Sequence, residues 1–403
     1  MAKVLSSTTI AQGTRYSGNF NTDFVTRDVE KDIYLIEPYN YPLFQYLYLQ
    51  NNKSVMTGNY LTKHEWGEDE LVPATDTLAS AGTGGSTTMT IKPTETALYK
   101  VGTRVRFEET DEIGTITAIT PNIVATKDSG NWTSVAKDGL ILILGESYSE
   151  SATPAGFIRT SKVMLYNYCQ IFSKFVSMSE RAIMASMNGG LYYGNDWDYE
   201  MKKKATEMKR DIEMAFWFNG ATSASSSSGV YTTRTGGVIQ QITDNGGYIG
   251  TYSSSLDEDE FDNFLKNKKL GSNQATLFCG LDVASDVEKI VKARYSNDGA
   301  VKKYGAIEGS DNISVITYSA VGKTIDIVRV PLWEGKYAKW AVLLDDNHIK
   351  LQHAGNDHKG SRKMRLEQLV KADGTPLKEA QFKADVGVIV TNAKTACILK
   401  PSA

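Results

Sequence analysis

One segment constrains this chain more than any other, a long amphipathic stretch at residues 196–219. Its apolar side chains recur at steps of three and four residues, which is the spacing of one face of an α-helix. They are Trp197, Met201, Ala205, Met208, Ile212, Ala215 and Phe216. A helix of this length is about 36 Å long. Because only one of its faces is apolar, we expect it to lie across a sheet or domain, with these side chains packed against it.

The opposite face of this helix is rich in charge. Its basic side chains are Lys202, Lys203, Lys204, Lys209 and Arg210, and its acidic ones include Glu200, Glu207, Asp211 and Glu213. The basic cluster alone would suggest a contact with nucleic acid. Acids share the surface, however, and Asp198 and Glu200 stand four residues before Lys202 and Lys204, a favourable spacing for ion pairs. We therefore expect a solvent-exposed face with internal ion pairs.

Residues 55–178 have the character of β-strands, with short runs of Val, Ile, Thr and aromatic residues between Gly, Pro, Asn and Asp. In 101–107, Val101, Thr103, Val105 and Phe107 alternate with Gly102, Arg104 and Arg106. This period of two is typical of a half-buried strand. Further strands are expected at 89–91, 114–119, 122–126 and 140–144. Such short strands suggest a small closed barrel at about 86–147, inserted in an extended ribbon whose two sides are 60–66 and 157–176.

The part after residue 257 alternates between helix and strand patterns. Residues 257–270 begin with acids and end with lysines before Gly271, as the helix dipole favours. A second helix is expected at about 283–295. Strands are expected at 275–279, 313–317, 324–330, 340–344, 348–351 and 386–391. This half is therefore predicted to be a mixed α/β domain with its own sheet.

The first residues, 1–27, are polar and contain three isolated aromatic side chains, Tyr16, Phe20 and Phe24. They show no helical or strand period, so this segment cannot form a core by itself. We expect an arm whose aromatic residues dock on a neighbouring subunit. Helices follow within 28–54, near 28–37 and from Pro42 onward, since proline suits the first position of a helix.

Composition excludes several classes of protein. The 44 Lys and Arg nearly balance the 47 Asp and Glu, giving a formal charge of −3, which argues against a protein held to nucleic acid by bulk charge. No apolar run approaches the roughly 18 residues of a membrane span, and the start has no apolar signal core, so a soluble protein is expected. Cys169, Cys279 and Cys397 are far apart in sequence and are expected to be buried thiols.

Motifs for catalysis or cofactor binding are absent from the sequence. It contains no G-x-S-x-G, no phosphate-binding G-x-x-x-x-G-K-[ST] and no H-E-x-x-H. His348, His353 and His358 lie near aspartates, but residues five apart on a strand face opposite sides, so a surface or interface role is favoured over a metal site. We expect no enzymatic activity and no cofactor. A carbohydrate-binding or carbohydrate-active module, which would use tryptophans and carboxylates in a cleft, stays an alternative, although core packing is the favoured role of the tryptophans.

The order of these parts resembles the major capsid protein of tailed bacteriophages, the Hong Kong ninety-seven type of fold, in the branch whose extended loop carries a β-barrel. Six segments carry the resemblance. They are Trp66-Gly67-Glu68-Asp69-Glu70-Leu71 at the ribbon tip, Tyr99-Lys100-Val101-Gly102-Thr103 in the barrel, Asn167-Tyr168-Cys169-Gln170-Ile171-Phe172 with Val176-Ser177-Met178-Ser179 in the return strand, Glu207-Met208-Lys209-Arg210-Asp211-Ile212-Glu213 in the spine helix, Arg234-Thr235-Gly236-Gly237-Val238 after it, and Leu343-Leu344-Asp345 with Ile349 and Leu351 late in the chain.

The resemblance implies an α+β architecture of named parts. They are an N-terminal arm (1–27), N-terminal helices (28–54), an extended β-ribbon loop (55–178) with the barrel at about 86–147, a peripheral domain (179–250) with the spine helix at 196–219, an α/β axial domain (251–345), and a return to the peripheral domain with C-terminal strands (346–403). Residues expected at subunit interfaces are Tyr16, Phe20, Phe24, Trp66, Leu78, Arg104 and Arg106. Those expected to pack the spine helix are Trp197, Met201, Met208, Ile212 and Phe216.

The resemblance also implies a function and partners. The chain would self-assemble into hexamers and pentamers of an icosahedral shell around double-stranded DNA, within the virion, after assembly in the bacterial host cytoplasm. No charged scaffolding segment precedes the arm, so a separate scaffolding protein is expected, together with portal and head-decoration proteins, weak non-specific contact with packaged DNA, and no membrane. A phage tail or tube protein and a cargo-filled cellular nanocompartment remain alternatives. Electron microscopy would separate closed shells from tubes, and co-purifying enzyme cargo would indicate a nanocompartment.

Overall fold

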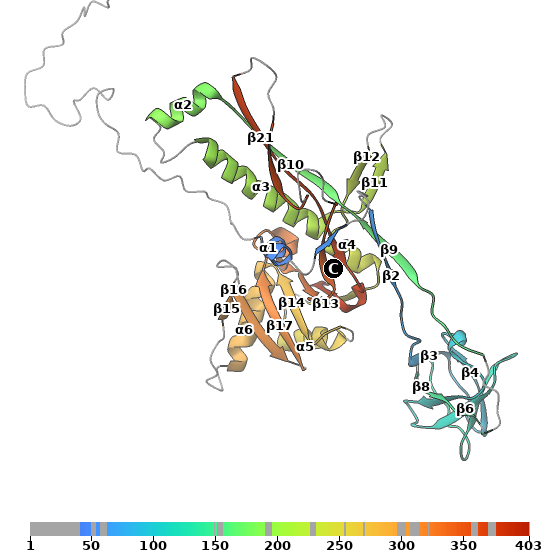
Figure 1. Ribbon diagram of the computed structural model, residues 1–403. Coiled ribbons are helices and arrows are strands. Elements are labelled where there is room, and N and C mark those ends of the chain that lie inside the picture. Colours follow the sequence, from blue (N-terminus) through green and yellow to red (C-terminus); the bar gives the residue numbers. More distant parts are fainter. Residues whose placement is uncertain are drawn as a thin grey trace, which may run out of the picture. The chain divides into compact units, whose positions relative to one another are not determined.

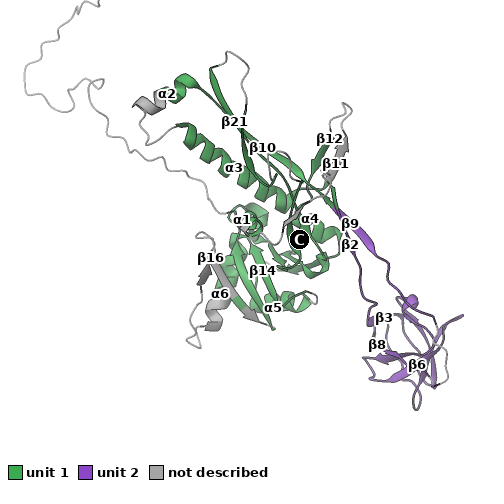
Figure 2. Cartoon of the chain, in the orientation of Figure 1, with its two compact units in different colours: residues 1–64, 167–403 green, residues 65–166 purple. Residues whose placement is uncertain are grey.

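The computed structural model describes residues 41–49, 54–56, 63–148, 150, 156–189, 196–225, 231–253, 255–268, 271–295, 304–306, 314–320, 322–355, 362–369 and 376–402. The chain divides into two compact units (Figure 2). Unit 1 comprises Met1–His64 and Asn167–Ala403, and unit 2 comprises Glu65–Tyr166. The predicted arm with Tyr16, Phe20 and Phe24, and the helix expected near 28–37, lie outside the described residues.

Unit 2 contains a closed antiparallel barrel of six strands in the order β3-β4-β7-β6-β5-β8. The strands are β3 (Thr75–Ser80), β4 (Thr88–Pro93), β5 (Thr103–Phe107), β6 (Ile113–Ala118), β7 (Ile123–Lys127) and β8 (Leu140–Glu146), and a short 3₁₀ helix, η5 (Thr96–Leu98), follows β4. The predicted alternation holds in β5, where Val105 and Phe107 are buried and Arg104 is half-buried. The barrel starts earlier than expected because β3 has only one large apolar side chain, Leu78, and therefore shows little pattern.

The barrel core is organised around one aromatic pair. The rings of Phe107 and Trp132 meet edge to face with centroids 5.2 Å apart, and Trp132 donates its Nε1–H to the carbonyl of Ala125 at 3.1 Å. Gly114 permits this arrangement, because a Cβ there would lie 2.5 Å from the Trp132 ring. The barrel thus has its own close-packed core.

The chain enters and leaves unit 2 through a two-stranded sheet of β2 (Lys63–Glu68) and β9 (Val163–Tyr168). The expected ribbon side at 157–176 was therefore partly wrong. It is divided at Cys169, and the residues after it form β10 (Gln170–Ser179), which pairs antiparallel with β21 (Leu377–Val390) in another sheet. β10 leaves the ribbon because Phe172 and Val176 are buried on that sheet, on the side of the spine helix.

The first sheet of unit 1 has the order β1-β19-β21-β10, with β20 also pairing β21. Figure 1 shows β10 and β21 beside each other. Its strands are β1 (Ser54–Met56), β19 (Ile349–His353), β20 (Arg365–Gln368), β21 (Leu377–Val390) and β10. The predicted long helix is α3 (Asp196–Phe218), which contacts β10 and β21. Met208, Ile212 and Phe216 have no exposed surface and belong to the main core. Trp197 packs with Val176 and Ala380 in a smaller cluster, to which Met201 adds a partly buried side chain.

Shorter elements surround this sheet. They are α1 (Pro42–Leu49), α2 (Glu180–Gly189), the strand pair β11 (Thr222–Ser225) and β12 (Tyr231–Arg234), and α4 (Val238–Asp244). α1 begins at Pro42, as its sequence predicts. Most of the side chains of α1 are buried in the core that also receives α3.

The second sheet of unit 1 has seven strands in the order β13-β22-β18-β14-β17-β16-β15. They are β13 (Tyr248–Tyr252), β14 (Gln274–Cys279), β15 (Tyr304–Ala306), β16 (Ser314–Ala320), β17 (Lys323–Arg329), β18 (Ala341–Leu344) and β22 (Cys397–Pro401). The accompanying helices are α5 (Glu258–Asn267), α6 (Leu281–Tyr295), η6 (Gly335–Lys339) and η7 (Ala393–Thr395). α5 starts with a capping box between Asp257 and Glu260. Cys279 and Cys397 are buried free thiols here, as Cys169 is elsewhere in unit 1, so the cysteine prediction is confirmed.

The end of the chain and the charged face of α3 show details that the sequence did not indicate. The last strand, β22, lies between β13 and β18 in the seven-stranded sheet, and the return of residues 346–403 to the peripheral domain with C-terminal strands stays a prediction. β22 takes a central place because Cys397, Ile398 and Leu399 are all buried. On α3, Glu213 was placed on the solvent-exposed face, yet it is fully buried. The ion pairs on that face also differ, since Lys203 pairs with Glu200 and Lys204 with Glu207.

Candidate assembly surfaces

The β2–β9 sheet carries apolar side chains that nothing in the described chain covers fully. Val163, Met164 and Tyr166 on β9 are 55%, 63% and 52% exposed. Val163 and Met164 are successive residues, so they point to opposite faces of the strand. A two-stranded sheet is at best marginally stable alone in water, and exposed apolar surface of this kind marks an interaction site. The sheet is therefore suited to being covered by another molecule.

A second apolar surface lies within unit 2. Leu71 is 93% exposed and Phe157 is 79% exposed. Phe157 borders a hollow of about 320 Å³, whose lining is Val72, Leu98, Lys100, Thr103, Ile143, Gly145, Glu146, Phe157 and Ile158. Lys100 forms an ion pair with Glu146 there, and Tyr148 donates its hydroxyl to the same carboxylate at 2.9 Å. The hollow is mainly apolar with one polar edge, as in many binding sites.

The third surface is the face of the β10–β21–β20 sheet that is turned away from α3, which we call the open sheet face. Residues directly opposite each other in antiparallel strands share a face, so Ile171 and Phe175 of β10 lie on the same side as Asp385 and Gln381 of β21. Ile171 is 60% and Phe175 is 49% exposed. The neighbouring Phe172 and Val176 point the other way and are buried. The open sheet face thus presents apolar side chains to solvent.

Charged side chains frame this face and are paired with one another. Arg362 reaches Asp385 at 3.3 Å, and Glu367 accepts from Arg365 at 2.6 Å and from Lys383 at 3.2 Å. Burial raises the pKa of Asp385, and Arg362 opposes this shift. These charged side chains are therefore mostly occupied by ion pairs within the chain. Ile171 and Phe175 remain as the main apolar surface of the open sheet face that a neighbouring molecule could cover.

The interface residues expected from the sequence have different environments. Trp66 on β2 is half-buried and donates its Nε1–H to Glu68 at 2.8 Å. Arg104 pairs with Asp128, and Arg106 pairs with Asp111 at 2.6 Å, both on the surface of the barrel. The prediction that Leu78 lies at an interface is wrong, because this side chain has no exposed surface and packs in the barrel core. A side chain without exposed surface cannot contact a neighbouring subunit in this conformation.

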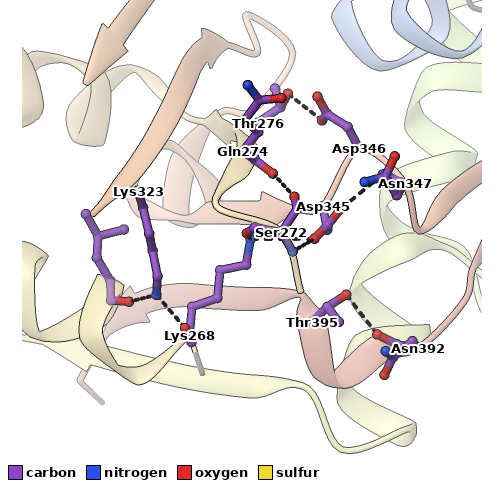
Figure 3. Close-up of polar contacts among 11 residues, drawn as sticks. Lys268, Ser272, Gln274, Thr276, Lys323, Asp345, Asp346, Asn347, Asn392 and Thr395 are labelled. Carbon is purple, nitrogen blue, oxygen red and sulfur yellow. Dashed lines mark hydrogen bonds and ion pairs between the residues drawn. The ribbon is translucent and has the colours of Figure 1, made fainter. Parts of the chain in front are cut away.

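A buried polar cluster at one end of the seven-stranded sheet was not expected from the sequence (Figure 3). Lys268 and Asp345 lie 3.9 Å apart with almost no exposed side-chain area. Asp345 accepts the backbone N–H of Ser272 at 2.5 Å and that of Asn347 at 3.0 Å, and Lys268 donates to the carbonyl of Ser272 at 3.1 Å. Lys323 donates to the carbonyls of Leu265 and Lys268. The cluster thus connects the end of α5 to the starts of β14 and β17 and to the end of β18.

The electrostatics of this cluster follow from burial. Burial lowers the pKa of Lys268, and Asp345 partly offsets the shift. Burial would raise the pKa of Asp345, but the hydrogen bonds from Asn347 and Ser272, with Lys268, lower it overall. Gly271, with a φ of +88°, is required there, because a Cβ would lie 2.5 Å from Asp345 Oδ2. All of these interactions join residues of unit 1 to one another. The cluster is therefore a structural network rather than a substrate site.

Among the residues whose positions the structure describes, no group of three or more His, Cys, Asp or Glu is arranged to hold a metal ion. No helix in the same residues is both long and apolar enough to cross a membrane. His348 Nδ1 lies 3.3 Å from Thr391 Oγ1, His353 is buried with Nδ1 2.9 Å from the carbonyl of Ala354, and His358 lies outside the described residues.

Comparison with known proteins identifies the family. Residues 15–402 match the family model described as SU10 major capsid protein. The chain belongs to the SU10 major capsid protein family. It is a phage major capsid protein, a component of the virion shell, and the resemblance drawn from the order of its sequence motifs is confirmed. None of the curated proteins searched matches the chain.

Solved structures agree on the fold of this SU10-family protein. The capsid of cyanophage A-1(L) has a TM-score of 0.54 and 8% identity, over 94% of this chain and 98% of that chain. The capsid of a native GTA particle has a TM-score of 0.50 and 11% identity, over 97% of this chain and 99% of that chain. These likenesses confirm the predicted α+β capsid fold, and the closed six-stranded barrel of unit 2 is the insertion that the sequence suggested.

The three apolar surfaces of this capsid protein had only weak signals in the sequence. Ile171, Ser173, Phe175 and Ser177 are two residues apart and share one face of the strand, and this mixture of apolar and polar side chains does not show whether the face is covered. Leu71 and Phe157 are each followed by one further large apolar residue, Val72 and Ile158, in segments too short to show a period. Their exposure depends on the packing of distant segments, so local pattern could not reveal it.

Proposed function

We propose that this major capsid protein assembles into rings of six and five copies that close into an icosahedral shell around double-stranded DNA, and that its role is structural rather than catalytic. The observation that carries the proposal is the β2–β9 sheet with Val163, Met164 and Tyr166 about half exposed. Together with the hollow in unit 2 and the open sheet face, it gives each copy three separate apolar contact surfaces. Surfaces that differ from one another suit head-to-tail contacts, which close into rings.

The distribution of charge supports the same arrangement. Unit 2 contains more acidic than basic residues, whereas the rest of the chain has a small excess of basic residues. Unlike charges favour contact between unit 2 of one copy and unit 1 of the next over contact between two copies of unit 2. Each contact is modest after the loss of rotational and translational freedom, but many contacts in one closed shell reinforce each other. The stability of the shell is then collective.

The remaining partners in the proposal follow from this role. A separate scaffolding protein would guide curvature, a portal protein would occupy one vertex, and decoration proteins would bind the outer surface, with assembly in the cytoplasm of the bacterial host. The arm at 1–27 would lie on a neighbouring copy through Tyr16, Phe20 and Phe24. The near-neutral charge of the whole chain suits weak, non-specific contact with packaged DNA.

Electron microscopy and sedimentation of the full-length protein test the proposal. Wild type should form closed shells, alone or when co-expressed with its scaffolding protein. The double variant Met164→Asp, Tyr166→Asp should remain folded but yield no closed shells, because it places charge in the proposed contact. The control Lys162→Ser changes an exposed polar residue next to the same strand and should assemble normally. Tubes in place of shells, or normal shells from the double variant, would contradict the proposed arrangement.

A further inference from the structure

The buried carboxylate of Glu213 belongs to none of the three candidate assembly surfaces. It lies on α3, one turn before Trp217, and has no exposed surface. Its Oε1 accepts the backbone N–H of Leu43 at 3.2 Å and the Nε1–H of Trp217 at 2.8 Å. Its Oε2 accepts the backbone N–H of Phe44 at 2.6 Å. Two helices distant in sequence are therefore joined at one side chain.

The start of α1 explains why this acceptor is needed. A helix begins with N–H groups that have no partner within the helix, and a Ser, Thr, Asp or Asn before it usually accepts one of them. Here the residue before the helix is Tyr41, which is a poor cap, and Pro42 has no N–H. The first two N–H groups of α1 are those of Leu43 and Phe44, and both donate to Glu213. The carboxylate of α3 thus replaces the missing local cap.

The surroundings of Glu213 suit a group that only accepts hydrogen bonds. All three partners are donors, and in the described part of the chain Glu213 forms no ion pair. The titratable residues of α1 are Tyr46 and Tyr48, Tyr41 directly precedes this helix, and Lys209, Arg210 and Asp211 lie within one turn before Glu213 on α3. The other elements packed around Trp217 contribute the apolar rings of Phe278 and Trp333.

We propose that ionised Glu213 is an interhelix cap that fixes the first turn of α1 on the spine helix, and that protonation of this carboxylate loosens that turn. An ionised carboxylate accepts all three donors, and the partial positive charge at the start of a helix favours it. A protonated carboxyl group carries an O–H donor, and its three partners are donors as well. The O–H therefore has no acceptor among these partners, and the cap is weakened. The inference does not depend on the proposed shell geometry.

The direction of the pH dependence can be worked out. Burial raises the pKa of Glu213 from 4.5 to about 7, against the three hydrogen bonds, which lower it. The folded state therefore holds this proton more tightly than the unfolded state does. The resulting contribution to global stability is fully present below about pH 4.5 and is lost as the pH rises to about 7. Local order in the first turn of α1 should change in the opposite direction. When that turn opens while Glu213 stays buried on α3, the carboxylate loses the two backbone hydrogen bonds that lower its pKa, so its pKa rises further and protonation favours the opened turn.

Hydrogen exchange of the wild-type protein tests whether local order in α1 and global stability change in opposite directions with pH, and it needs no variant. After correction for the intrinsic exchange rate, protection of the amides in 41–49 relative to those of α4 should rise roughly tenfold between pH 6 and pH 8, about the effect of gaining a helix cap. α4 serves as the internal reference, because Glu213 is not bonded to it. If protection of 41–49 instead falls together with the global stability, or does not change, the interhelix cap is refuted.

The isosteric variant Glu213→Gln gives an independent test. If the burial of charge were the dominant effect, this neutral amide would stabilise the protein at pH 8. The cap predicts instead that protection in 41–49 falls roughly tenfold at pH 8, since the amide presents an NH₂ donor to at least one N–H. The part of the pH dependence of global stability between pH 4.5 and 7 that comes from Glu213 should also disappear. The control Glu207→Gln, a partly exposed residue of the same helix paired with Lys204, should change neither measurement. Unchanged protection in Glu213→Gln would overturn the proposal, and if that variant does not fold, the wild-type measurement decides.

Discussion

Two phenylalanines on β10 provide a direct test of which face of the sheet serves assembly. Phe172 is 8% exposed on the side of α3, and Phe175 is 49% exposed on the open sheet face. A phenylalanine buries about 200 Å² when fully covered, so about 100 Å² of Phe175 remains available to a neighbour. At about 25 cal/mol per Å² this surface contributes roughly 2.5 kcal/mol to each contact. The variant Phe175→Ser should therefore weaken association at that contact roughly 50-fold to 100-fold.

The assay compares the protein concentration at which shells appear, by light scattering and electron microscopy, with the urea unfolding of the isolated subunit. Phe175→Ser should raise the assembly threshold strongly and change the unfolding free energy of the subunit by about 1 kcal/mol or less. Phe172→Ser is the matched control and should act in the reverse way, lowering the unfolding free energy by about 3–5 kcal/mol through loss of core packing. An unchanged assembly threshold for Phe175→Ser would refute the use of the open sheet face as a contact.

Three more outcomes are expected. Met208→Asp should prevent soluble folding, because it buries a charge at a fully buried position of α3, whereas Met214→Asp, at a position 39% exposed on the same helix, should fold; equal solubility would contradict the assignment of the buried face. Phe107→Ala should lower the stability of the barrel by about 3–5 kcal/mol and speed hydrogen exchange in unit 2 only, with the exposed Leu144→Ala as its control. Deletion of residues 1–24 should leave a folded subunit, by circular dichroism, that assembles poorly; normal shells would show that the arm is dispensable.

Local periodicity accounts for what was predictable in the fold. The apolar residues of α3 recur every three or four positions and those of β5 every two, and each pattern depends only on the geometry of its own element. The order of such elements was also enough to indicate the capsid fold. β3 and β22 were harder to place, since a strand's position in a sheet depends on partners far away in the sequence.

The candidate surfaces show the limit of the same reasoning. Leu78 looked suitable for an interface and proved to be core, while Phe175 looked like any strand residue and proved to be exposed. Trp66, Arg104 and Arg106 remain interface predictions. Whether an apolar residue of a strand meets a helix or solvent is decided by which face of the sheet that helix covers, and the sequence of the strand does not contain this information.

The sequence by itself determined α1, α3, α5, α6 and five of the six barrel strands, because hydrophobic period and turn residues are properties of short segments, whereas α2, α4 and β3 were not predicted. Only the tertiary structure decided that Glu213, one of several acids on a charged helix, is buried at the start of α1, and that β10 leaves the ribbon to pair with β21. Both outcomes depend on contacts between segments more than a hundred residues apart, and the free energy of such contacts comes from surfaces that exist only after the chain has folded.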